Sequence, residues 1–198
     1  MKLTELTTVK ARLEIDNADT ADDVILTNTI TALSERIEND TNRKFDYQAA
    51  ATFQFRGNTM DILPDRFPVL SVDTLETKDN EATGWVAVAD QDMPDILIGE
   101  RLNVIELSSA VGNSRNLARV TYAAGYILPG CAAVNGVSPL PPDLEQAVVE
   151  QVCYWYQRRN QLGLVSVSGD GGSVSQFRTL DLLPSVAAVV RKYERMIL

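Results

Sequence analysis

Residues 142–160 read PDLEQAVVEQVCYWYQRRN, and residues 161–179 continue QLGLVSVSGDGGSVSQFRT. The first stretch predicts a helix, because proline is tolerated in a first helical turn and Asp143 suits the positive end of the helix dipole. Its apolar side chains leave only a narrow polar stripe: Leu144, Ala147, Val148, Val149, Val152, Cys153, Tyr154, Trp155 and Tyr156 are apolar or aromatic. Such a helix lies either at the centre of its own domain or with one flank against a second subunit, and the sequence leaves both interpretations open.

The segment 161–179 contains four glycines and four serines. It lacks the G-x-x-x-x-G-K-[ST] pattern and the lysine with which a P-loop holds phosphate. It also carries more apolar side chains than a plain linker needs, namely Leu164, Val165, Val167, Val174 and Phe177. We therefore expect a flexible arm at 161–179, part of which docks on another surface.

Two helical patterns open the chain. Apolar spacings of three and four predict a short helix over 4–13 and a longer one from about 21 to 41. The longer helix has a single narrow apolar stripe, formed by Leu26, Ile30, Leu33 and Ile37. Asn42 follows it and is the usual substitute for glycine in the left-handed conformation that ends a helix.

Acidic residues gather between these two helices at Asp16, Asp19, Asp22 and Asp23. One interpretation is a calcium loop, but the spacing lacks the glycine and the distal glutamate of an EF-hand. Helix capping by Asp19 or Thr20, with acids at the positive end of the dipole, explains the cluster better.

From Tyr47 the apolar period changes to two, and short apolar runs are separated by turn residues. The predicted strands are 52–55, 60–63, 69–75, 85–88, 97–107 and 117–124. Pro94 and Gly99 limit the run 97–107 to a sheet edge or a bulge. The fold class is therefore α+β. We expect about four helices, with residues 1–46 packing with 142–198 as one helical domain, and an antiparallel β-sheet or small barrel inserted at 47–141.

The amino-acid composition limits the classes of function that the chain can have. The chain has 198 residues, no histidine and a formal net charge of −9, so it lacks the commonest general base and metal ligand. We expect no catalysis, metal or cofactor. Two distant cysteines, Cys131 and Cys153, fit a reducing compartment, and we expect neither a signal peptide nor a membrane-spanning helix.

Two other functions have candidate residues in this sequence. A hydrolase would have to hold a metal through Asp90, Asp92 and Asp95, which are more simply acids of a solvated turn. A DNA-binding packaging or regulatory factor would use the cations of the C-terminal third, Arg158, Arg159, Arg178, Arg191, Lys192 and Arg195. Those on the last helix, which opens at Pro184, are explained by the helix dipole alone, and an acidic chain is poorly suited to neutralising phosphates.

Three motifs in a fixed order resemble the head–tail connector, or head-completion adaptor, family of tailed phages and prophages. The first is LTTVKARL at 6–13, an acidic loop, a long helix and IENDTNRKF at 37–45. The second is VTYAAGY at 120–126 followed by PPDLEQA at 141–147. The third is YQRR at 156–159, the Gly/Ser arm and Leu183-Pro184. The family often shows Thr-Gly-Arg where this chain has Thr41-Asn42-Arg43.

The resemblance implies a structural virion protein at the head–tail junction, made in the bacterial cytoplasm. Copies would form a ring, usually dodecameric, below the portal protein, extending the DNA channel and providing a platform for head-completion or tail proteins. A tail-completion protein at the same junction is the nearest alternative. We expect the subunit or portal interface to come from the end of the 142–160 helix and from the arm, that is from Tyr154, Trp155, Arg158, Arg159, Leu164, Val165, Val167, Val174, Phe177 and Arg178.

Overall fold

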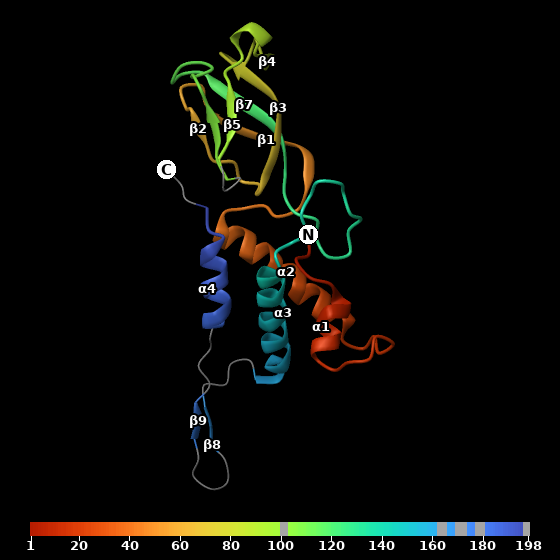
Figure 1. Ribbon diagram of the computed structural model, residues 1–198. Coiled ribbons are helices and arrows are strands. Elements are labelled where there is room, and N and C mark those ends of the chain that lie inside the picture. Colours follow the sequence, from red (N-terminus) through yellow and green to blue (C-terminus); the bar gives the residue numbers. More distant parts are fainter. Residues whose placement is uncertain (100–102, 162–165, 169–173, 177–180, 196–198) are drawn as a thin grey trace. The chain divides into compact units, whose positions relative to one another are not determined.

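The computed structural model describes residues 1–99, 103–161, 166–168, 174–176 and 181–195 (Figure 1). The chain divides into two compact units. The helical unit joins Met1–Asp40 with Pro141–Tyr193, and the β unit joins Thr41–Leu140 with the chain end from Glu194. The fold class is α+β, as the periodicities predicted.

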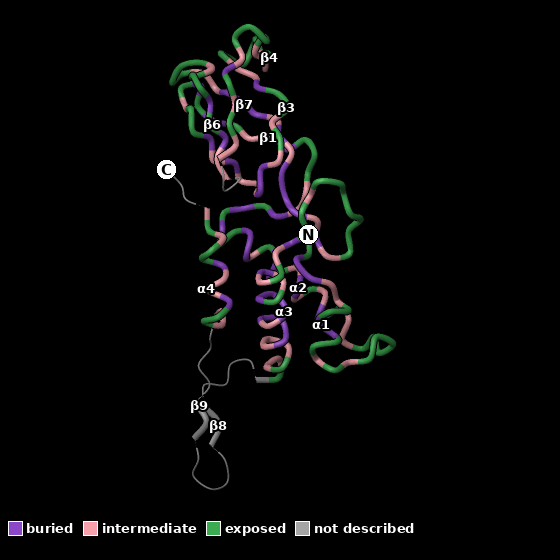
Figure 2. The backbone as a smooth tube through the Cα atoms, viewed as in Figure 1, coloured by how far each residue is buried: buried purple, intermediate pink, exposed green. Residues whose placement is uncertain are grey.

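Among the described residues the helical unit contains four α-helices: α1 (Leu6–Arg12), α2 (Asp23–Thr41), α3 (Pro142–Gln157) and α4 (Pro184–Lys192). α3 packs against α1 and α4. The predicted apolar stripe of α2 is fully buried, and so is the stripe of α3 formed by Leu144, Val148 and Val152 (Figure 2). The helix that opens at Pro184 ends at Lys192, and Ile197 lies outside the described residues.

Loop hydrogen bonds precede the start of α2, and a left-handed residue follows its end. Asp16 and Asp19 do not cap the helix itself, because they accept hydrogen bonds from the backbone amides of Ala18 and Ala21 in the preceding loop, at 2.9 and 3.1 Å. α2 therefore starts at Asp23, two residues later than predicted. At the other end Asn42 has φ +51, the left-handed conformation expected of it.

The β unit has one sheet of four strands in the order β1–β7–β3–β4 and one of three in the order β2–β6–β5, all neighbours antiparallel. The first comprises β1 (Gln48–Arg56), β7 (Leu117–Ala124), β3 (Val69–Lys78) and β4 (Val86–Ala87). The second comprises β2 (Asp61–Ile62), β6 (Ile105–Leu107) and β5 (Ile96–Ile98). Over the described strands the sheets stay open, so of the two alternatives the structure has the sheet and not the barrel.

One predicted strand is wrong. The run 97–107 forms two short strands, β5 and β6, that pair with each other instead of one continuous strand. The Gly99 amide donates to the Val104 carbonyl oxygen at 2.9 Å, so the antiparallel pairing of β5 with β6 extends to the glycine that limits this run.

β7 organises the core of the β unit. Its side chains alternate between partly buried and buried, and Ala118, Val120, Tyr122 and Ala124 are the buried ones. The Tyr122 hydroxyl donates to Asp65 at 3.0 Å, and burial together with this carboxylate raises the pKa of Tyr122. β7 ends at Ala124, and the φ of +107 at the next residue, Gly125, brings the backbone beside Asp46 and Tyr47. No helix in the described part of the chain is long and apolar enough to span a membrane.

Candidate interaction surface

The C-terminal end of α3 carries three consecutive aromatic side chains that are only partly buried: Tyr154, Trp155 and Tyr156. The residues one turn earlier on the same helix, Val152 among them, are buried. Partly exposed aromatic and arginine side chains are the residues enriched in protein interfaces. This aromatic end of α3 has the composition of an interface and not of a domain core.

Both predicted arginines of this end lie against the aromatic rings. The Arg158 guanidinium lies over the Tyr154 ring at 5.0 Å and donates to the Tyr154 hydroxyl. The Arg159 guanidinium lies 3.9 Å from the centroid of the Tyr156 ring. These contacts hold the planar guanidinium groups and rings in fixed positions, which lowers the entropy lost when a partner binds.

Tyr156 and Arg159 also fix the start of the arm. The Tyr156 hydroxyl donates to the Asp22 carboxylate, and Arg159 forms an ion pair with the same carboxylate at 3.6 Å. This hydrogen bond, with a contribution from burial, raises the pKa of Tyr156. The loop that precedes α2 is thereby tied to the C-terminal end of α3.

The loop before α2 is itself built around a buried lysine. Lys10 of α1 is 2% exposed, and its ammonium group donates to the carbonyl oxygens of Asn17 at 3.2 Å and Asp19 at 2.5 Å. It also forms an ion pair with Asp23 at 2.7 Å. A lysine ammonium therefore supplies the positive charge among these oxygens.

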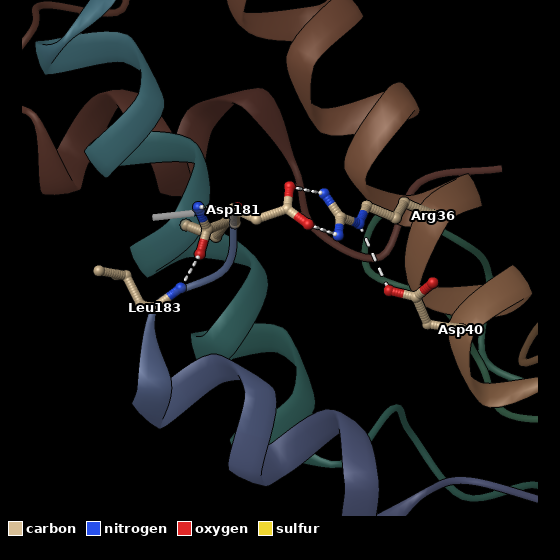
Figure 3. A network of polar contacts seen from close by, with 5 residues as sticks. Arg36, Asp40, Asp181 and Leu183 are labelled. Atoms are coloured by element: carbon tan, nitrogen blue, oxygen red, sulfur yellow. Dashed lines mark hydrogen bonds and ion pairs between the residues drawn. The ribbon is translucent and has the colours of Figure 1, made fainter. Parts of the chain in front are cut away.

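The far end of the arm is held by Arg36 of α2 (Figure 3). Its guanidinium makes a bidentate pair with Asp181, with both N–O distances 2.5 Å, and a longer contact of 3.3 Å to Asp40. These hydrogen bonds hold the pKa of Asp181 below its ordinary value and raise that of Arg36. Bidentate geometry fixes the direction of Asp181 as well as its position.

A buried glutamine of α3 also holds the chain at Asp181 and Leu183. Gln151 is 0% exposed, and its side-chain oxygen accepts from the Leu183 amide at 2.8 Å. Its side-chain nitrogen lies 3.5 Å from the Asp181 carbonyl oxygen. The chain is therefore fixed to the helical unit on either side of 162–180, by Asp22 at the start and by Arg36 and Gln151 at the end.

Sequence reasoning missed Lys10, Arg36, Gln151 and Asp181. Gln151 could have been found, because it stands between Val148 and Val152 on the apolar side of the helix, where an amide needs partners. The partners of Lys10 and Arg36 lie in other elements, and a single sequence gives no signal for such pairs.

The described part of the arm consists of β8 (Ser166–Ser168) and β9 (Val174–Gln176), which pair antiparallel with each other. Val167 and Val174 of the predicted interface lie in these strands. Leu164, Val165, Phe177 and Arg178 lie outside the described residues.

The alternative site residues do not come together. Asp90 and Asp92 lie in the short helix η1 (Asp90–Asp92), and in the described residues no three acids, cysteines or histidines gather as a metal site would require. Of the arginines and lysine proposed for DNA, Arg159 pairs with Asp22 and Lys192 pairs with Asp143 at 2.6 Å. Arg195 lies in the β unit, where it donates to the Leu63 carbonyl oxygen and stacks on Phe53.

Trp155→Ala should cost the isolated subunit only about 1–2 kcal/mol, because the side chain is partly exposed and truncating a fully buried tryptophan costs about 3–5 kcal/mol. Leu144→Ala on the same helix is the control, since Leu144 is 0% exposed and should cost about 2–5 kcal/mol. Denaturant titration of the two variants compares them. A Trp155→Ala loss equal to that of a buried core residue would assign Trp155 to the domain core.

The chain is thus an α+β subunit whose helix α3 ends in partly exposed aromatic side chains directly before the arm. A family model described as head completion protein matches residues 2–196, and the chain belongs to this family. The predicted resemblance is therefore confirmed, and with it the function of a structural head–tail connector.

Solved structures share the fold. A chain from "Neck of empty GTA particle computed with C6 symmetry" is 17% identical with a TM-score of 0.57, covering 97% of this chain and 89% of that one. A chain from "Neck of native GTA particle computed with C12 symmetry" is 17% identical with a TM-score of 0.52, covering 100% and 96%. A third, from "Virion of native gene transfer agent (GTA) particle", is 18% identical with a TM-score of 0.51, covering 90% and 80%. No curated protein sequence matches the chain.

Proposed function

We propose that copies of this chain form a closed ring of twelve subunits, the family's usual arrangement, at the head–tail junction of a phage-like particle. The ring docks below the portal protein, extends the channel through which DNA leaves, and provides the docking platform for head-completion or tail proteins. Its role is mechanical and not enzymatic, and it assembles in the bacterial cytoplasm.

The observation that carries this proposal is the anchoring of the arm at both ends. Ion pairs and hydrogen bonds hold the chain at Asp22 on one side and at Arg36 and Gln151 on the other. A segment fixed in this way is presented from a defined place on the helical unit, as a contact between neighbouring subunits requires. The aromatic end of α3, directly before the arm, supplies side chains that favour protein contacts.

The net negative charge of the chain supports a channel through which DNA passes without being bound tightly. The net charge of −9 gives little opportunity for counterion release, which drives non-specific DNA binding. The titles of two structural neighbours name C6 and C12 symmetry in the neck of a gene transfer agent particle, which accords with a ring of this fold.

Deletion of residues 164–177 should leave the subunit folded and abolish ring assembly. The contacts that fix the two ends of the arm lie outside the deletion, so the thermal transition of the isolated subunit should shift by only a few degrees. Mass measurement and electron microscopy, with the portal protein of the same particle present, would report assembly.

A Gly/Ser replacement of the same fourteen positions is the matched control, because it keeps the length of the arm and removes its side chains. It should fail to assemble as the deletion does if the arm binds through its own side chains or strands. Loss of the thermal transition in the deletion variant would instead make the segment part of the core and contradict its role as an arm.

A further inference from the structure

The β unit leaves one long strand edge unpaired. The two sheets have four edge strands, and three of them are very short: β2 and β4 have two residues each and β5 has three. Short edges are a common protection against pairing with other chains. β1 is the exception, because it has nine residues and pairs only with β7 among the described strands.

The register shows which backbone groups of β1 face outward. The Gly57 amide donates to the Asn116 carbonyl oxygen at 3.0 Å, so this position faces β7. Amide directions alternate along an antiparallel strand, and the amides and carbonyls of Thr52, Gln54 and Arg56 therefore point away from β7. The side chains of these three residues are exposed.

The edge strand carries a single charged residue, Arg56, at its last position. From Gln48 to Phe55 the strand has no charged residue and no proline, whereas lysines and prolines commonly block open edges. A bulge between Gln48 and Ala51 disturbs only the first residues of the strand. The Arg56 carbonyl oxygen already accepts from the Thr59 amide at 2.9 Å, so the stretch from Ala51 to Phe55, which has regular register, is the part that can accept a further strand.

The arm contains two short strands that belong to neither sheet of the β unit. β8 and β9 have three residues each and carry no charge, and they pair only with each other in the described residues. A two-stranded hairpin of this size is at best marginally stable alone in water. Each subunit thus contains one open edge and one hairpin.

We propose that the β8–β9 hairpin of one subunit adds to the open edge of β1 in the next subunit and extends its four-stranded sheet. The inference rests on the proposed ring and names the contact that closes it. A head-to-tail contact of this kind uses every edge and every hairpin once when the ring closes. Backbone hydrogen bonds supply the affinity, as in other cases of strand addition.

Gln54→Pro tests the edge, with Gln54→Ala as its matched control. Proline removes the outward amide and leaves the inward hydrogen bonds to β7, a position where edge strands tolerate it, while alanine keeps the amide. Both variants should show nearly the same thermal transition as isolated subunits. In the presence of the portal protein, Gln54→Ala should form rings, and Gln54→Pro should lose at least about tenfold in ring yield.

Cysteine cross-linking tests whether the β8–β9 hairpin of another copy lies at the β1 edge. In a Cys131→Ser background, a Thr52→Cys protein is assembled together with either a Ser166→Cys or a Ser175→Cys protein, so that a disulfide through the new cysteines can form only between copies. At least one mixture should give covalent dimers under oxidising conditions, and Thr52→Cys mixed with the background protein should not.

The outcomes separate the two proposals. Rings formed equally well by Gln54→Pro and Gln54→Ala, or the absence of cross-links from both mixtures, would overturn the strand addition and leave the ring standing. A failure of the unsubstituted chain to form rings on the portal protein would overturn both.

Discussion

Gly125→Ala is expected to unfold the β unit almost completely, with a loss of at least about 4 kcal/mol in the free energy of unfolding. Gly125 has φ +107, where side chains other than glycine are strained by about 1–3 kcal/mol. A methyl group there would also lie 2.3 Å from the Asp46 carbonyl oxygen and 2.7 Å from the Tyr47 Cα atom. Both contacts are with backbone, which cannot move aside as a flexible side chain can.

The position of Gly125 makes this overlap costly. Its amide donates to the Pro68 carbonyl oxygen at 2.9 Å, and the Tyr126 amide donates to the Phe45 carbonyl oxygen at 2.7 Å. These bonds join the end of β7 to the chain before β1 and before β3. A shift that relieves the methyl group would break them and disturb the start of both neighbouring strands.

Gly84→Ala is the matched control. Gly84 has φ +67, so alanine is strained there too, but no atom lies within 4 Å of its Cβ position. It should cost about 1–2 kcal/mol, the price of the left-handed conformation alone. Denaturant titration of both variants separates strain from overlap. Equal losses would mean that the close approach at Gly125 does not exist in solution.

Local patterns predicted much of this fold. The stripe from Leu26 to Ile37 and the alternation of β7 each mark a buried face, because burial of one face imposes its period on the sequence. Asn42 likewise marked its helix end through a conformation that few residues adopt. The aromatic end of α3 was found through the excess of apolar side chains around that helix.

Pairs distant in sequence could not be predicted in this way. Arg36 and Asp181 are 145 positions apart, and each alone has the appearance of an ordinary surface charge. The anchoring of the arm therefore became visible only in three dimensions. The open edge of β1 was equally hidden, because an edge is defined by the strand that is missing beside it, which periodicity does not report.

The acidic loop shows how one unrecognised residue changes an interpretation. Asp16 to Asp23 suggested either helix caps or a calcium site, since the sequence gave no reason to connect these acids with Lys10. In the structure the lysine ammonium supplies the positive charge for the cluster. Its aliphatic stem is buried with α1, and only the fold brings its end to the loop.

Lys10→Met should therefore destabilise the helical unit by about 2–3 kcal/mol, because it removes the buried ammonium group that pairs with the partly exposed Asp23 and donates to two backbone carbonyl oxygens. Methionine keeps most of the buried stem, so the loss reports the ammonium group. Asp23 and the carbonyl oxygens of Asn17 and Asp19 lose their common donor. Lys2→Met, at an exposed lysine, is the control and should change stability by less than about 0.5 kcal/mol.

A second substitution separates the ion pair from packing. Lys10→Met combined with Asp23→Asn removes both charges, so the double variant should be more stable than the sum of the single losses predicts. Hydrogen exchange should show faster opening of the amides from Asp19 to Asp23 in Lys10→Met. Because Asp22 accepts from Tyr156 and pairs with Arg159, this loosening should reach the start of the arm and weaken ring assembly. Unchanged exchange and stability in Lys10→Met would show that the loop is held without the ammonium group.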